Sequence, residues 1–136
     1  MNINNRNIFF KAKLEINNKA WVYGNHLEEM KVKFYNTQTI RSYTNFIYSH
    51  SGVKHKILVN TLCQYIEKED AYGIKIFEKD ILVDSFNGKH YFVFYNKYVS
   101  SYRLILADDK NWYPANATIK IKNPGEYIRL GNIFDK

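Results

Sequence analysis

The sequence predicts a mostly β protein, built of short antiparallel strands in small barrel-like sheets, with at most one or two short helical turns. Three observations support this fold class. Apolar and polar residues alternate with a period of two along most of the chain. Aromatic residues, which favour strands, make up 17% of the 136 residues. Turn signals recur at short intervals, which is typical of small all-β folds.

The alternation is clearest near the N-terminus. In a strand expected at residues 7–14, one side is expected to carry Ile8, Phe10, Ala12 and Leu14, and the other side Asn7, Phe9, Lys11 and Lys13. Gly24 is expected to weaken or bulge the return strand of this hairpin. The strands expected in the first half of the chain cover residues 7–14, 20–23, 30–35, 40–48 and 56–59.

The second half begins with a predicted helical turn at 62–66, capped by Asn60 or Thr61. A tight connection at 77–80 separates two apolar strands, and Asn87-Gly88 favours a two-residue hairpin turn. A further turn is expected at 108–111. The strands expected here cover residues 74–76, 81–83, 91–95, 102–106, 118–122 and 127–134.

The positive charge is concentrated in the first half of the chain. The formal net charge is +7; residues 1–60 hold 9 basic and 3 acidic residues, whereas residues 61–136 hold 11 and 10. We therefore expect a single compact domain, 1–136, with a basic β sub-lobe at 1–60 and a nearly neutral one at 61–136. Such asymmetry points to an anionic partner. The alternative is that the charge only keeps a small domain soluble.

Residue types and motifs exclude several classes of protein and of site. A single cysteine, Cys63, cannot form an intramolecular disulfide or a multi-cysteine zinc module. His50, His55 and Cys63 fit no metal-ligand spacing, so no metal site is expected. No phosphate-binding glycine loop or nucleophile motif is present. We expect no catalytic residue, no enzyme activity and no cofactor. The sequence has no recognisable signal peptide and no apolar stretch long enough to span a membrane, so we expect a cytoplasmic, non-membrane protein.

One segment has a recognisable pattern. Residues 61–83 read TLCQYIEKEDAYGIKIFEKDILV, with IFFKAK and WVYG before them and GNIF near the end of the chain. This pattern resembles the YopX family, small proteins of bacteriophages and prophages. The resemblance implies an SH3-like barrel in the 61–136 region and a phage origin, hence action in a bacterial host cell; it supplies no catalytic residue. Glu67 and Lys79 stand where the family has glycine, and a left-handed backbone at Lys79 would cost roughly 1 kcal/mol.

Within this motif Glu78 and Asp80 lie at a predicted turn between two strands. Asp80 is expected to accept backbone N–H groups there, as Asx turns do. An acid/base or metal pair is the alternative, but no histidine lies nearby in the sequence to complete it.

Basic residues interleaved with aromatic ones are the strongest binding signal, because single-strand binders combine cations with stacking platforms. The alternative is that most of the tyrosines pack in or beside the core. The first predicted cluster comprises Lys31, Lys33, Tyr35, Arg41, Tyr43, Lys54, His55 and Lys56, and the second comprises Tyr95, Lys97, Tyr98, Tyr102 and Arg103.

These observations predict a non-enzymatic phage or prophage accessory protein that acts by binding, in host takeover or counter-defence. Its expected target is anionic, either nucleic acid or the acidic surface of a host protein. The predominance of lysine over arginine argues against base-specific recognition. Two alternatives stay open. One is a homo-oligomeric sponge that sequesters a nucleotide messenger, and the other is a purely structural phage protein.

Overall fold

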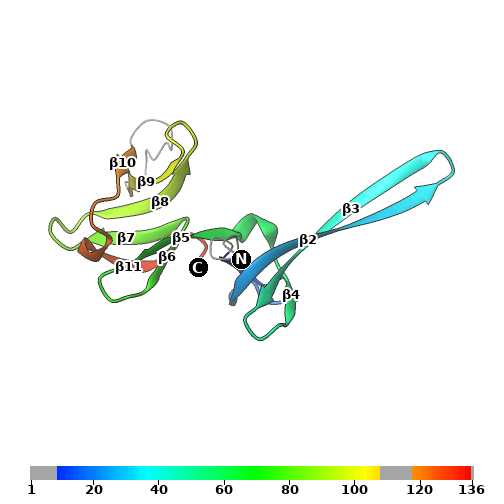
Figure 1. Cartoon of the computed structure of the whole chain (residues 1–136), viewed down its shortest axis with the longest axis horizontal. Helices are drawn as coiled ribbons and strands as arrows, with labels where there is room; N and C mark the ends of the chain where they lie inside the picture. The colour runs from blue at the N-terminus through cyan, green and yellow to red at the C-terminus, as the bar shows by residue number, and fades with distance from the viewer. Residues whose placement is uncertain (1–8, 108–117, 136) are drawn as a thin grey trace, which may run out of the picture. The chain divides into compact units, whose positions relative to one another are not determined.

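A computed structural model describes residues 9–107 and 118–135 and divides the chain into two compact units, Met1–Gln64 and Tyr65–Lys136 (Figure 1). Within these residues, each unit consists of antiparallel strands and one short 3-10 helix. The described strands close no barrel, so the β-rich class of the prediction is confirmed and the barrel is not. The start of the first expected strand, at residues 7 and 8, and the turn at 108–111 lie outside the described residues.

The first unit is a single sheet with strand order β4-β3-β2-β1-β5. Its core lies on one face, where Ala12, Val22, Ile47 and Ile57 are buried. Phe10 and Leu14 pack against this core, which confirms the alternation expected near the N-terminus. The elements are β1 (Phe10–Lys13), β2 (Trp21–Tyr35), β3 (Gln38–Ser49), β4 (Lys54–Lys56), η2 (Val59–Thr61) and the first residues of β5 (Cys63–Glu69).

β2 runs without interruption through Gly24, so the expectation of two separate strands with a weak or bulged glycine is wrong. Gly24 faces Phe10 of β1 on one side and Ser49 of β3 on the other. Its φ is 155°, and a Cβ atom there would lie 1.8 Å from the carbonyl oxygen of Tyr48. Glycine is therefore needed because another backbone approaches closely.

Beyond its base, the β2–β3 hairpin forms a two-stranded ribbon, which we call the arm (residues 28–45). β1 pairs with β2 only as far as Gly24, and β4 pairs with β3 only from Phe46 onward. The two strands of the arm continue in register to Tyr35 opposite Gln38. Asn36 in the closing turn has a φ of 51°, which asparagine tolerates. Figure 1 shows the hairpin extending away from the other strands of its unit.

The prediction of a helical turn at 62–66 is wrong. A 3-10 turn ends at Thr61, and Cys63 already begins β5, where it pairs with Lys11 of β1. Strand pairing with a distant segment thus overrides the local preference for a helical turn.

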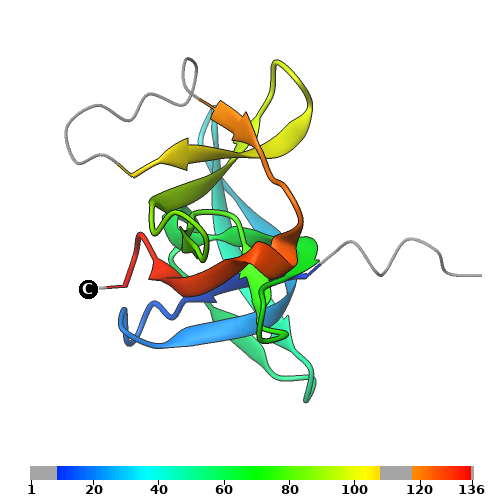
Figure 2. The same ribbon diagram turned by 90° about the vertical axis from the view of Figure 1, so that its left-hand side faces the viewer.

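The second unit contains a hairpin of β5 and β6 and a five-stranded sheet of order β10-β9-β8-β7-β11 (Figure 2). Its elements are β6 (Lys75–Phe77), β7 (Asp80–Asp84), β8 (His90–Asn96), β9 (Ser101–Leu106), β10 (Thr118–Lys120), η3 (Pro124–Glu126) and β11 (Tyr127–Asn132). Its core comprises Ile66, Ile76, Leu82, Tyr91, Val93, Leu104, Ile121 and Tyr127.

The predicted hairpin at Asn87-Gly88 is present, but its loop is longer than two residues. Val83 pairs with His90, and the Asp84 backbone N–H donates to the Lys89 carbonyl, which leaves residues 85–88 to make the connection. The Asp84 carboxylate accepts hydrogen bonds from the backbone N–H groups of Phe86 and Asn87. These bonds support a wider turn than Asn-Gly alone would form.

The motif at residues 61–83 contributes to a buried polar network. The carboxylate of Asp80 is fully buried and accepts hydrogen bonds from the Phe77 backbone N–H (2.7 Å), Arg129 Nε (2.9 Å) and Asn132 Nδ2 (2.8 Å). Asn132 Nδ2 also donates to the backbone carbonyl of Glu78. The expectation that Asp80 accepts a backbone N–H is confirmed, and its role here is to hold the turn.

Lys79, between these two acidic residues, has a φ of 68°. An L-residue in this left-handed region costs roughly 1–2 kcal/mol. We expect Lys79→Gly to raise the free energy of unfolding by about 1 kcal/mol, measured by urea denaturation of the full chain. As a control, Lys75→Gly on strand β6 should lower it by about 0.5–1 kcal/mol. A Lys79→Gly variant no more stable than the wild type would contradict this prediction.

Candidate nucleic-acid interface

Several cations of the first unit are not free at its surface. Lys11 and Lys13 are buried, and the Nζ atom of each lies 4.7 Å from the centre of a Trp21 ring. Both lysines are stabilised in part by cation–π attraction. The formal charge of the N-terminal half therefore overstates what a partner would meet.

Two further lysines of the first predicted cluster form ion pairs. Lys54 Nζ lies 3.0 Å from the carboxylate of Glu29, and Lys56 Nζ lies 3.2 Å from that of Glu15. The hydrogen bond to Glu29 raises the pKa of Lys54 above its usual value. These two lysines are therefore less available to an external anion than the sequence suggested.

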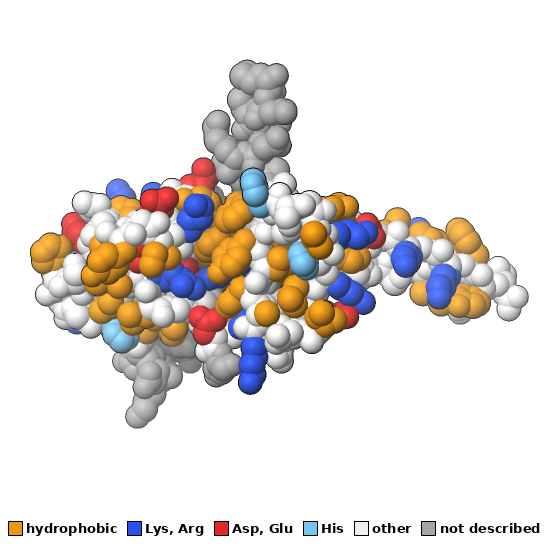
Figure 3. Space-filling view, turned by 90° about the horizontal axis from the view of Figure 1, so that it is seen from below, with side chains coloured by type: hydrophobic (Ala, Val, Ile, Leu, Met, Phe, Trp, Pro, Cys, Tyr) orange, Lys and Arg blue, Asp and Glu red, His pale blue; other side chains and the backbone are white. Residues whose placement is uncertain are grey.

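The remaining cations of that cluster lie on the arm. Lys31, Lys33 and Arg41 are exposed, and none of them forms an ion pair with any residue that the structure describes. In Figure 3 the arm extends to the right, and basic side chains lie among hydrophobic ones along it.

Strand register divides the arm into two faces. Residues directly opposite each other in an antiparallel pair point to the same side, and successive residues alternate. Lys31 is opposite Ser42, and Lys33 is opposite Ile40. The side that we call the lysine face therefore carries Lys31, Lys33, Tyr35, Gln38, Ile40 and Ser42.

The opposite side, which we call the apolar face, contains the other members of the predicted arm cluster. Met30 is opposite Tyr43, and Val32 is opposite Arg41. Arg41 and Tyr43 thus point away from Lys31 and Lys33, so the structure does not bring these cations together on one face. The apolar face carries Glu28, Met30, Val32, Phe34, Thr39, Arg41, Tyr43 and Asn45.

The lysine face is free of uncompensated negative charge. Glu29 lies on this side at the base of the arm, but its carboxylate is bound by Lys54. Lys54 Nζ also lies 4.5 Å from the centre of the Phe46 ring. No Asp or Glu occurs anywhere between Glu29 and Glu67. This acid-free stretch is the sequence signal that could have located the face more narrowly.

His55 does not belong with its two lysine neighbours. It is opposite Ile47, whose side chain is in the core of the unit, and is itself half-buried. The period of two therefore places the imidazole on the core side of the sheet, away from the side chains of Lys54 and Lys56.

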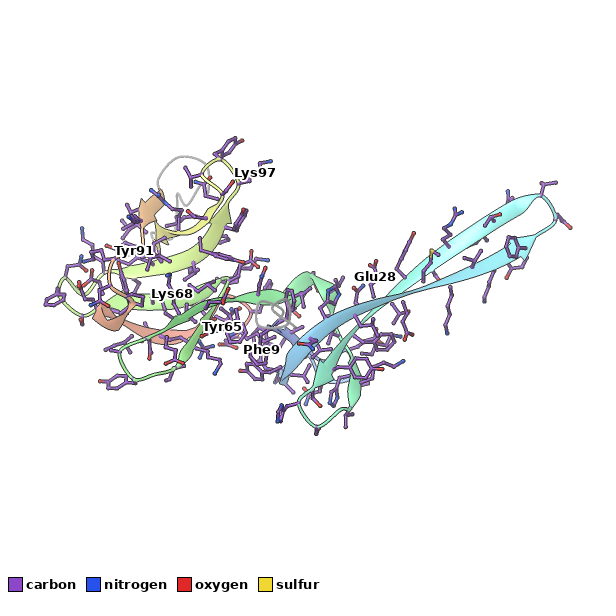
Figure 4. All side chains as sticks on the ribbon, viewed as in Figure 1. Phe9, Glu28, Tyr65, Lys68, Tyr91 and Lys97 are labelled. Carbon is purple, nitrogen blue, oxygen red and sulfur yellow. The ribbon has the colours of Figure 1, made fainter. Side chains whose placement is uncertain are left out.

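The second predicted cluster is also divided. The rings of Tyr95 and Tyr102 meet edge to face, with centroids 5.2 Å apart. Burial raises the pKa of Tyr102 to about 12. Arg103 is opposite Phe94, on the other side of the sheet. Lys97 and Tyr98 are exposed in the turn between β8 and β9, with Lys97 Nζ 5.7 Å from the centre of the Tyr98 ring (Figure 4 labels Lys97). Tyr95, in β8, is exposed as well.

Neither described pocket resembles a nucleotide site. A pocket of about 270 Å³ in the first unit is lined by Phe9, Gly24, Asn25, Tyr48, Ser49 and His50, with no lysine or arginine. One of about 380 Å³ in the second unit is open and is lined by Gly88, Lys89, His90, Leu106 and Ala107. Within residues 9–107 and 118–135, no three His, Cys, Asp or Glu residues gather as metal ligands.

Over the same ranges the structure holds no helix long and apolar enough to span a membrane. No protein-family model and no curated protein matches this chain.

Proposed function

We propose that this protein binds nucleic acid through the lysine face of the arm. The observation that carries this proposal is the placement of Lys31, Lys33 and Tyr35 on one exposed side of a two-stranded ribbon without a free carboxylate. A two-stranded β-ribbon fits the major groove of a duplex. The acidic surface of a host protein, the other target considered, is less favoured because a narrow ribbon suits a groove.

Lys31 and Lys33 lie about 7 Å apart along the strand, so each can neutralise a separate phosphate. Lysine ammonium groups act as point charges and do not form the bidentate contacts that read bases. Tyr35, near the tip, offers a ring for stacking on an exposed base. The arrangement therefore supports binding to the backbone with little sequence preference.

The test is fluorescence polarisation with labelled duplex and single-stranded oligonucleotides over a salt series. We expect Lys31→Ala/Lys33→Ala to weaken binding at least tenfold at low salt. It should also reduce the slope of log affinity against log salt by about 1.8 on a duplex, because two phosphate contacts are lost.

The matched control is Lys68→Ala/Lys89→Ala, which removes the same charge from exposed positions of the second unit that belong to neither predicted cluster. It should change the affinity little. Equal losses in the two double variants would show that net charge alone is responsible. No binding by the wild type at low salt would overturn the proposal altogether.

We also propose, from the resemblance, that the chain is a YopX-like phage or prophage accessory protein with an SH3-like barrel in its second half. Glu67 and Lys79, the two positions at which the family has glycine, have φ values of 63° and 68°. Positive φ is what a position requiring glycine should show, which supports the proposal. An experimental structure of a YopX-family protein with negative φ at both glycines would contradict it. A counter-defence role and the nucleotide-sponge alternative stay predictions.

A further inference from the structure

The apolar face of the arm extends the core side of its sheet out into solvent. At the base of the hairpin this side carries buried Val22 and Ile47. Farther out, Met30, Phe34 and Tyr43 are 52%, 76% and 56% exposed. A two-stranded ribbon with nothing packed on it is marginally stable in water. Contiguous exposed apolar side chains of this kind mark an interaction surface.

The two charged residues of this face are Glu28 and Arg41, both exposed (Figure 4 labels Glu28). Neither forms an ion pair with a described residue. They belong to rows about 13 Å apart along the ribbon, so they do not pair with each other. The row of Met30 and Tyr43 lies midway between them.

We propose that the occupant of this face is a second copy of the chain, packed face to face and antiparallel about a two-fold axis through the Met30–Tyr43 row. A two-fold axis joins each patch to the same patch on the other copy. The Glu28 row of one copy then meets the Arg41 row of the other, twice. The apolar side chains are buried between the two arms.

The placement of the charges favours a second copy over other occupants. Glu28 and Arg41 lie at equal distances on either side of the Met30–Tyr43 row. Two copies of this face therefore bring opposite charges together only when the second ribbon runs antiparallel to the first. A parallel ribbon would bring like charges together, which is destabilising. A nucleic acid would be repelled by the Glu28 carboxylate. The dimer leaves both lysine faces outward, so this inference stands independently of the nucleic-acid proposal.

Charge reversal tests the pairing directly. Sedimentation equilibrium of the full chain measures the dimer dissociation constant. Glu28→Arg and Arg41→Glu should each weaken the dimer at least tenfold, although they change the net charge in opposite directions. The double variant Glu28→Arg/Arg41→Glu should return to within about threefold of the wild type. Single variants that weaken the dimer without rescue in the double variant would overturn the pairing.

Two neighbouring aromatic residues provide a second, independent test. Phe34→Ser, on the apolar face, should convert the protein to a monomer, whereas Tyr35→Ser, on the lysine face, should not; circular dichroism checks that both variants fold. Equal effects of the two would overturn the proposal, as would a wild-type monomer at several hundred micromolar. If Phe34→Ser instead weakens oligonucleotide binding without changing the molar mass measured by sedimentation, nucleic acid occupies this face and the dimer proposal is wrong. Lys31→Ala/Lys33→Ala should leave the mass unchanged.

Discussion

Gly24→Ala is expected to destabilise the first unit by about 3 kcal/mol or more. The new methyl carbon would lie 1.8 Å from the carbonyl oxygen of Tyr48 and 2.7 Å from its carbonyl carbon. Both atoms belong to the backbone, so no flexible side chain can move aside. β2 pairs with neighbours on both sides at this residue, and any shift would disturb both ladders.

The measurement is amide hydrogen exchange on the full chain, because it reports each unit separately. Protection should fall in β1 to β3 and stay unchanged in β7 to β9. Gly52→Ala is the matched control: Gly52 has a φ of 85°, but an added Cβ meets nothing within 4 Å. It should cost only about 1 kcal/mol of backbone strain. Equal effects of the two variants would show that the close approach at Gly24 is unimportant.

Asp80→Ala is expected to destabilise the second unit by about 3–5 kcal/mol. The variant removes a fully buried carboxylate on which a backbone N–H, the Arg129 guanidinium and the Asn132 amide converge. Arg129, itself only 21% exposed, would keep its charge without this acceptor. The turn at Glu78–Lys79 would lose the carboxylate that closes it.

Urea denaturation followed by exchange of the β7 and β11 amides measures the effect. Glu69→Ala serves as the control, since Glu69 is an exposed carboxylate of the same unit. It should change the stability by no more than about 0.5 kcal/mol. A loss below about 1 kcal/mol in Asp80→Ala would mean that the network contributes little to the fold.

The local features of the fold could be predicted because they depend on neighbouring residues. Alternation correctly put Phe10, Ala12 and Leu14 on the core side of their strand, where Ala12 is buried and the other two pack against the core. The two apolar strands predicted on either side of 77–80 correspond to β6 and β7. Asp80 as an acceptor of a backbone N–H also followed from turn chemistry. The prediction of a helical turn at 62–66 failed because Cys63 pairs with Lys11, which lies 52 residues earlier in the chain, and local propensity takes no account of pairing with a distant segment.

The candidate binding site was only partly predictable. The arm residues of the first predicted cluster lie close together in the sequence but are divided between the two faces of the arm. Arg41 and Lys33 look alike in the sequence, yet the register turns one away from the other. Lys11 has the same alternating context as Lys31, but Trp21 covers Lys11 whereas Lys31 is exposed. Such differences depend on which strands pair and on how far the sheet extends. The alternation of apolar and polar residues in the sequence specifies neither.

The closing turn of the arm has a consequence for how this hairpin can vary. Tyr35 faces Gln38 across Asn36 and Thr37, and this two-residue connection sets every pairing below it. A slip of one residue would send each side chain of one strand to the other side of the ribbon. Arg41 would then join the lysines, and Ile40 would join Phe34. The arm can therefore accept many changes of residue type, but inserting or deleting a single residue in its turn would mix its two surfaces.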